Sequence, residues 1–451
     1  MKSSFADYMS NRHPEYSIGR WSHIDVQFSV PFTEIYFQYP NQDDVRELIL
    51  YWSDHRFLAR GIQLQVAYYP RDVETAYFYS RLYQLIRKLT IRTLRLERVS
   101  PFDHTSTPMR LTQFASEICS WNFIIELNLS YSECSSESED LPPSLTWLSL
   151  PPHNVPLNHL ILPSTLKHLQ FDDVWNQPVE GWPQLPSSIQ TIHVGFHFRS
   201  SFSGLVLPSS LTQLQLGSCY YTQSLNDLIL PDGFRSLRLV YWNRPVTELC
   251  RLPSSMTELV FLFDFNQPID EMILPSSLTT LVLSGQFNQP VNRLVLPDSL
   301  RLLRFGDNFN QGVDELKLPS SLTELHFGTS FNQPIDRLLL PSSLREIDFG
   351  RGKFNQPIPA TFFPHNLRVL KLSQDFDQPI AHWKLPSTVK SIEFGKCFTQ
   401  SLQSLPHDYW PISIERVTFY QLAIKSASAP ISFTRRQLQQ QPPPNHLGLQ
   451  S

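Results

Sequence analysis

Two histidines four residues apart, His193 and His197 in the stretch HVGFHF, have the spacing that metal-binding helices use. On a helix this spacing places two ring nitrogens on one face. Here, however, the surrounding residues predict a strand followed by a loop, where side chains four apart do not converge. The sequence therefore predicts no metal site and no cofactor.

Motifs for other catalytic chemistry are also missing. The sequence contains no Gly-rich phosphate loop, no HExxH and no GxSxG. Acidic side chains at Asp172, Asp173, Glu258, Glu324 and Glu346 could in principle pair as general acid and base. Carboxylates on a solvated sheet face are far more often surface groups, so the sequence predicts that the protein is not an enzyme.

The cysteines do not form a recognisable set. There are five of them and no CxxC pair, which argues against a disulfide framework or a thiolate zinc site. Cys219 and Cys397 occupy the same place in their repeats (GSCYYTQSL and GKCFTQSL). We therefore expect small buried side chains rather than reactive thiols.

Charge and hydropathy exclude several classes of partner. The 451 residues include 37 basic and 41 acidic side chains, a formal net charge of -4, so no strong field attracts nucleic acid or an anionic membrane. The N-terminus lacks the apolar region of a secretory signal, and no apolar run approaches the roughly 20 residues that span a bilayer. The sequence predicts a cytoplasmic protein with neither nucleic acid nor membrane as partner.

A repeat dominates the chain. The segment FNQPIDRLLLPSSL, which begins at Phe331, recurs with small changes at Phe265, Phe287 and Phe309, and Leu-Pro pairs recur from Leu141 onward at steps of about 22 residues. A period of about 20 to 29 residues with the pattern L-x-x-L-x-L is typical of a leucine-rich-repeat solenoid, in which each repeat adds one short strand to a parallel sheet.

The alternation of side chains predicts a binding face. In the repeat at Leu278 the leucines of the pattern point inward, whereas Thr280, Val282 and Ser284 should point to the opposite, solvated face. In other repeats this face varies in residue type, and anchors of protein interfaces are enriched in aromatic residues and Arg. The candidate partner-binding residues are Trp147, His168, His193, Arg238, Leu302, Arg304, Glu324, His326, Glu346, Asp348, Lys371 and Glu393.

An aromatic residue followed by Asn recurs after the strand. An Asn side chain can satisfy backbone groups of a turn that no sheet ladder reaches, so we expect an asparagine ladder beside an aromatic stack. Its members are Asn176, Asn243, Asn266, Asn288, Asn310, Asn332 and Asn355. Asp377, Thr222 and Thr399 replace Asn and should satisfy the turn less completely.

These motifs resemble the FNIP-repeat family, a leucine-rich-repeat relative with units of the form LPxSLxxLxLxxxFNxPI. Residues 252–358 match this pattern almost position by position, with Gln where the family name has Ile. The resemblance implies a non-catalytic interaction surface. Some members carry an N-terminal F-box, which would make the solenoid the substrate-binding arm of a ubiquitin ligase.

The ends of the chain depart from the repeat. We expect residues 1–130 to form an irregular capping region with degenerate repeats and one helix, Asp72 to Leu89. Residues 131–420 should form the solenoid, and residues 421–451, rich in Ser, Gln and Pro, a disordered tail. Residues 1–40 are aromatic and interrupted by prolines, unlike the packed helices of an F-box.

The predicted fold is a β-rich solenoid, a leucine-rich-repeat-like parallel sheet of about 22-residue repeats with few helices and an irregular N-terminal cap. The predicted function is a non-catalytic scaffold that binds a protein partner of unknown identity on the sheet face. The alternative is a substrate-recognition subunit that docks a ubiquitin-ligase adaptor through a degenerate F-box-like N-terminus. A carbohydrate or small-ligand binder is a third possibility, disfavoured because the variable face lacks an aromatic platform.

Overall fold

The computed structural model describes residues 141–420 apart from 151–153, 155, 218–224, 250, 401, 403–404 and 407. It also describes the strand backbones at 24–29, 32–38, 62–68, 91–98 and 126–128, and residues 431–434 and 437. The chain divides into two compact units, Met1–Ser218 (unit 1) and Cys219–Ser451 (unit 2).

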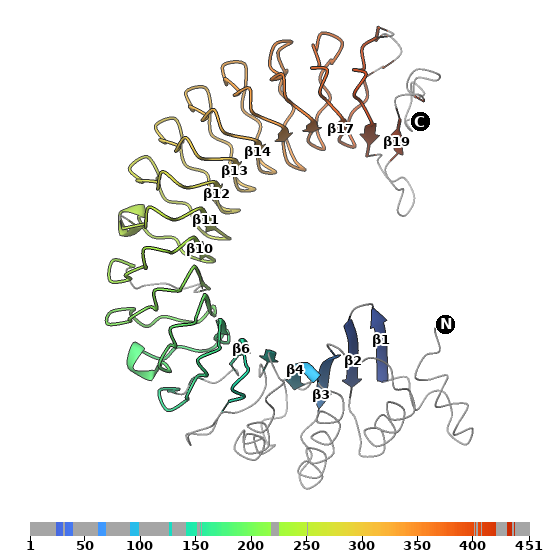
Figure 1. Cartoon of the computed structure of the whole chain (residues 1–451). Helices are drawn as coiled ribbons and strands as arrows, with labels where there is room; N and C mark the ends of the chain where they lie inside the picture. The colour runs from blue at the N-terminus through green and yellow to red at the C-terminus, as the bar shows by residue number, and fades with distance from the viewer. Residues whose placement is uncertain are drawn as a thin grey trace, which may run out of the picture. The chain divides into compact units, whose positions relative to one another are not determined.

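Unit 1 is built on a mostly parallel sheet (Figure 1). β1 pairs antiparallel with β2, and from β2 to β9 each strand pairs in parallel with the next strand of the chain. The elements are β1 (Ile24–Ser29), β2 (Phe32–Gln38), β3 (Ile62–Tyr68), β4 (Ile91–Arg98), β5 (Glu126–Asn128), β6 (Trp147–Ser149), β7 (His168–Gln170), the 3-10 helix η2 (Val179–Gly181), β8 (Thr191–Val194) and β9 (Gln213–Leu216).

Unit 2 continues the same pattern with greater regularity. β10 to β18 pair in parallel in chain order, and β18 pairs antiparallel with β19. The elements are β10 (Ser236–Leu239), the 3-10 helix η3 (Val246–Leu249), β11 (Glu258–Phe261), β12 (Thr280–Val282), β13 (Leu302–Arg304), β14 (Glu324–His326), β15 (Glu346–Asp348), β16 (Val369–Lys371), β17 (Ser391–Phe394), β18 (Arg416–Phe419) and β19 (Ile431–Phe433).

One repeat shows why this sequence forms a coil. Three corners turn the chain back on itself, each closed by a backbone N–H bonded to the carbonyl three residues earlier, at 3.0 to 3.1 Å: Leu278 to Pro275, Phe287 to Ser284 and Leu294 to Val291. The donor at each corner is a buried apolar residue, so the same side chain that fills the core also closes the turn. Each coil therefore packs its apolar residues against one another and against the neighbouring coils.

An aromatic stack runs through the interior of unit 2. The rings of Phe265, Phe287, Phe309, Phe331 and Phe354 lie 5.8 to 6.0 Å apart in successive coils, nearly parallel, and each ring is fully buried. The predicted stack is therefore present. One detail of the predicted alternation is wrong: Ser284 lies 2 % exposed, because its hydroxyl donates to the backbone carbonyls of Phe263 and Phe265 at the corner of the coil.

The predicted parallel-sheet solenoid with a repeat of about 22 residues is confirmed. Successive strands of unit 2 pair residues such as Leu281, Leu303 and Leu325, which are 22 apart. The helical elements described between residues 141 and 420 are η2 and η3 alone. No helix among the described residues is long and apolar enough to cross a membrane.

Two sequence predictions fall largely outside the described residues. The helix predicted from Asp72 to Leu89 lies there, and so does most of the predicted tail, 421–451, in which the structure describes β19, Thr434 and Gln437. The division into cap, solenoid and tail remains a prediction.

Candidate binding surface on the sheet face

The register of unit 2 assembles the sheet-face residues into two columns. The first column joins Leu302, Glu324 and Glu346 on β13 to β15, then Val369. The second column, two residues further along each strand, runs through Arg238, Val260, Val282, Arg304, His326, Asp348, Lys371 and Glu393. Because neighbouring strands lie about 4.8 Å apart, adjacent members of a column are in side-chain contact range.

Exposure differs along these columns. Arg238 and Arg304 are exposed, and Leu302 is half-buried. His326, which the sequence places on a solvated face, is 8 % exposed. This correction has a physical reason: the ring of His326 lies between the acidic side chains of its own strand and of the next strand, which cover it.

The face of unit 1 holds the three remaining candidates. Trp147 and His168 are direct neighbours in one column of β6 and β7, whereas His193 lies in the other column, opposite Gln170. All three are partly exposed. His197 is exposed on the turn after β8, where its backbone N–H donates to the Asp173 carbonyl, so the two histidines occupy a strand and a turn.

A charged cluster occupies the sheet face from β14 to β16. We define it as Glu324, His326, Glu346, Asp348 and Lys371. Nε2 of His326 lies 3.6 Å from Oε2 of Glu324, and Nδ1 lies 3.7 Å from Oδ2 of Asp348. The Lys371 ammonium lies 2.7 Å from Oε1 of Glu346 and 3.8 Å from Oδ2 of Asp348.

The surroundings shift two pKa values in the charged cluster. Burial raises the pKa of the Asp348 carboxyl, but the hydrogen bonds from His326 and from the Gly350 N–H, with the charges of Lys371 and His326, outweigh it and hold the pKa below its usual value. Burial lowers the pKa of Lys371, but Glu346, Asp348 and Glu393 outweigh it and raise the pKa above its usual value. Both groups therefore stay charged at neutral pH.

The asparagine ladder lies at the corner after the strand. In successive coils, Oδ1 of one Asn accepts the backbone N–H of the next Asn: Asn288 to Asn266, Asn310 to Asn288, and Asn332 to Asn310, all at 2.9 Å. Asn355 donates to Asn332 in the same way. Asn266 donates to Asn243, and in unit 1 Asn176 accepts from the next coil at Arg199 and Ser200.

Glutamine completes most rungs, which the sequence did not reveal. Nε2 of Gln311 donates to Oδ1 of Asn288 at 3.0 Å, and the same bond is made by Gln267, Gln289, Gln333, Gln356 and Gln378. At Asn176 the hydroxyl of Ser200 takes this place. The prediction that Asp377 satisfies the turn less completely than Asn does is wrong. Its Oδ1 accepts the Thr399 N–H at 2.8 Å and Gln400 Nε2 at 3.0 Å, because these rung bonds use the side chain as an acceptor, and a carboxylate accepts as well as an amide does.

A second ladder of hydroxyl groups runs along the Leu-Pro-Ser-Ser corner. Ser321 Oγ donates to the Leu300 carbonyl and Ser343 Oγ to the Leu322 carbonyl, both at 2.6 Å, and most other coils repeat the bond. The acceptor is always in the preceding coil. The recurrence of Ser at this position was the available sequence signal for the hydroxyl ladder. The sequence alone did not distinguish a hydrogen-bonding role of this Ser from an ordinary turn residue beside Pro.

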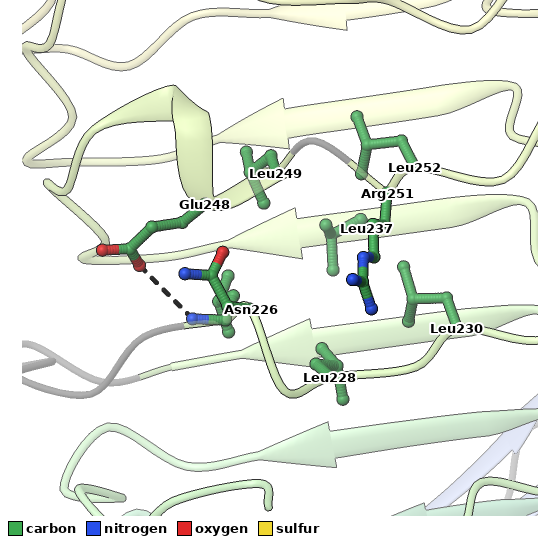
Figure 2. Close-up of a pocket in the computed structure, with 9 residues that line it drawn as sticks. Asn226, Leu228, Leu230, Leu237, Glu248, Leu249, Arg251 and Leu252 are labelled. Atoms are coloured by element: carbon green, nitrogen blue, oxygen red, sulfur yellow. Dashed lines mark hydrogen bonds between the residues drawn. The ribbon is translucent and has the colours of Figure 1, made fainter.

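Unit 2 also contains a small pocket beside η3 (Figure 2). Its cavity volume is about 20 Å³, enough for one water molecule. Glu248 Oε2 accepts the Leu225 N–H at 3.3 Å, and Glu248 Oε1 pairs with Arg244 at 2.7 Å. The acidic group is therefore occupied in holding two coils together.

Cys397 does not form a reactive thiol site. Burial raises the pKa of its thiol, and the neighbouring Asp375 raises it further, which disfavours the nucleophilic thiolate. The side chain is half-buried rather than fully buried as the sequence predicted. The other cysteines lie outside the described residues.

Unit 2 also exposes an apolar stripe outside the sheet face. The residue before the Leu-Pro pair is apolar and 70 to 83 % exposed in four repeats, at Ile229, Ile273, Val295 and Leu339. The charged residues Arg251 and Lys317 take the same position in the intervening repeats.

The fold and its two ladders define a class: the protein is a leucine-rich-repeat-like β-solenoid. Within it the chain carries FNIP repeats, since the FNIP Repeat family model matches residues 175–219, 242–286, 265–308, 309–352 and 354–397. The resemblance predicted from the sequence is thus confirmed for these residues.

One solved structure shows a similar fold. The crystal structure of CroV588, described as a novel circular LRR protein, aligns with a TM-score of 0.51 and 22 % identity over 87 % of this chain and 70 % of that one. An internalin (inlF) from Listeria monocytogenes aligns with a TM-score of 0.39 and 14 % identity over 76 % of this chain and 94 % of that one. No curated protein matches the sequence. At this identity the likeness to CroV588 shows the fold alone.

Proposed function

We propose that the protein is a non-catalytic scaffold that binds a protein partner on the sheet face of its solenoid. One contrast carries the proposal. The inward columns repeat the same apolar residues from coil to coil, whereas the paired columns on the sheet face change from Arg to Val, His, Asp, Lys and Glu. A solenoid needs repetition only where coils pack, so a non-repeating face is available for recognition.

The centre of this surface is the place where Leu302 and Arg304 on β13 adjoin the charged cluster, which begins on β14. Arg304 is exposed and takes part in none of the ion pairs among the described residues. Leu302 lies beside Glu324 in the first column. Arginine is enriched among the anchor residues of protein interfaces, so Arg304 is the anchor candidate of this surface. We expect a partner with an apolar anchor and a basic group that meets Glu324.

The test compares two charge reversals in one repeat. Arg304→Glu reverses a charge on the sheet face. Arg293→Glu makes the same charge change at an exposed turn residue between β12 and β13. Partners are captured from extract of the source cells with the whole chain and each variant, identified by mass spectrometry and rebound as purified proteins. We expect Arg304→Glu to lose a partner that Arg293→Glu retains, with melting temperatures unchanged. Retention of every partner by Arg304→Glu would contradict the proposal.

His326 is unsuitable for this test because it is buried, and a carboxylate placed there would adjoin Glu324 and Asp348. The ubiquitin-ligase alternative depends on residues 1–130, of which the structure describes only β1 to β5. No described residue favours it, so it remains a sequence prediction.

A further inference from the structure

The charged cluster contains a group of ligands that can hold a metal ion. One ring nitrogen of His326 and one carboxylate oxygen each from Glu346 and Asp348 all lie within 4.8 Å of one another. They come from adjacent strands, because the register sets His326 opposite Asp348 and Glu324 opposite Glu346. The four side chains thus form the corners of a square on the sheet.

His326 gives the independent sign that something binds there. Its Nε2 is buried and has no hydrogen-bond partner among the described residues, and its side chain is 10 % exposed. Buried polar atoms almost always have a partner, and a bound ion is one way in which an orphaned nitrogen is satisfied. Nε2 lies 3.6 Å from Oε2 of Glu324 and Nδ1 lies 3.7 Å from Oδ2 of Asp348, so both ring nitrogens face carboxylates of the charged cluster.

The charge balance favours a divalent cation. Three carboxylates, those of Glu324, Glu346 and Asp348, outnumber the single ammonium of Lys371, so the charged cluster carries an excess of negative charge. Lys371 already shows where positive charge is held, since its Nζ lies 2.7 Å from Glu346. An ammonium cannot accept the imidazole lone pair in a coordinate bond, but a metal ion can.

We propose that His326, Glu346 and Asp348 bind a divalent transition-metal ion, with zinc the best match and Glu324 a further carboxylate within reach. One imidazole with carboxylates suits zinc better than magnesium or calcium, which prefer all-oxygen ligand sets. Bonds of about 2.0 to 2.2 Å require ligand atoms about 3.4 Å apart, so from separations of up to 4.8 Å the side chains must close by up to about 1.4 Å. Lys371 turns away from Glu346 as the ion enters. This proposal does not depend on the sheet face binding a protein.

The test measures zinc affinity on the whole chain, without an affinity tag and after removal of bound metal by a chelator, in competition with a chromophoric chelator. We expect one zinc ion to bind wild type and His326→Ala to weaken binding by at least about tenfold. His365→Ala, a change at an exposed histidine of a turn, is the matched control and should leave the affinity unchanged. Cobalt in place of zinc should give visible absorption bands in wild type that His326→Ala removes.

Lys371 supplies a test with the opposite sign. Lys371→Met removes the competing ammonium and should tighten zinc binding, and the gain should disappear when His326→Ala is added, which separates the site from a group of carboxylates alone. If His326→Ala fails to fold, as judged by circular dichroism, Asp348→Asn replaces it and should weaken binding similarly. Absence of zinc binding in wild type, equal affinity in wild type and the ligand variant, or Lys371→Met without a gain in affinity would each overturn the proposed site.

Discussion

The asparagine ladder makes a quantitative prediction at Asn332. Its Oδ1 accepts two hydrogen bonds from the next coil, from the Asn355 N–H at 2.9 Å and from Gln356 Nε2 at 3.1 Å. Asn332→Ala removes both and leaves a partly buried backbone N–H without this acceptor. At about 1 kcal/mol net for each bond, we expect a loss of about 2 kcal/mol in the free energy of unfolding, within a range of about 1 to 3 kcal/mol.

Asn332→Asp is the matched control. A carboxylate keeps both acceptor contacts, as Asp377 does toward Thr399 and Gln400. We therefore expect Asn332→Asp to remain within about 0.5 kcal/mol of wild type. Urea unfolding followed by circular dichroism gives the free energies, and hydrogen exchange of the peptide containing Asn355 gives the local protection.

The two measurements must agree with the ladder. Asn332→Ala should accelerate amide exchange at Asn355 while Asn332→Asp should not. The reasoning is refuted if the two variants are equally destabilised, because that would mean the donor side of the amide matters, or if Asn332→Ala unfolds like wild type.

Further variants test other layers of the same structure. Phe309→Ala, at a fully buried ring of the stack, should cost about 3 to 5 kcal/mol in urea unfolding, and a loss under about 1 kcal/mol would show that the coils do not depend on the stack. Ser321→Ala should cost about 1 kcal/mol by removing its bond to the preceding coil, whereas Ser320→Ala, at the exposed neighbour, should be neutral; equal effects would contradict the hydroxyl ladder. Because the folded-state pKa of Asp348 is depressed, its contribution to stability is present above the ordinary carboxyl pKa of 3.8 and lost as pH falls through the lower folded value. The stability advantage of wild type over Asp348→Asn should therefore be full at pH 7 and shrink below about pH 4, and an advantage independent of pH would exclude this linkage.

Sequence periodicity was sufficient to predict the solenoid because each coil must form the same turns and bury the same apolar positions. An aromatic residue that returns every 22 or 23 positions with an Asn beside it is what stacked coils require, and both residues form the expected columns. The hydroxyl ladder was harder to predict because Ser is also an ordinary turn residue.

The burial of His326 could not be predicted from the repeat pattern. Alternation along β14 assigns it to the solvated face, and its burial comes from side chains of the same face, Glu324 two residues earlier and Asp348 in the next coil. The repeat period specifies which residues are neighbours across strands. It does not specify the side-chain conformations that decide whether one residue covers another. The proximity of His326, Glu346 and Asp348 could not be predicted for the same reason.

The most direct test of the central claim, recognition on the sheet face, is site-specific photo-crosslinking. A photoreactive phenylalanine analogue replaces Leu302 on the sheet face or, as control, Val295 on the apolar stripe, which is 76 % exposed. Crosslinking is measured with the partner that Arg304→Glu loses. We expect covalent adducts at Leu302 and none at Val295; adducts at Val295 without adducts at Leu302 would contradict binding on the sheet face.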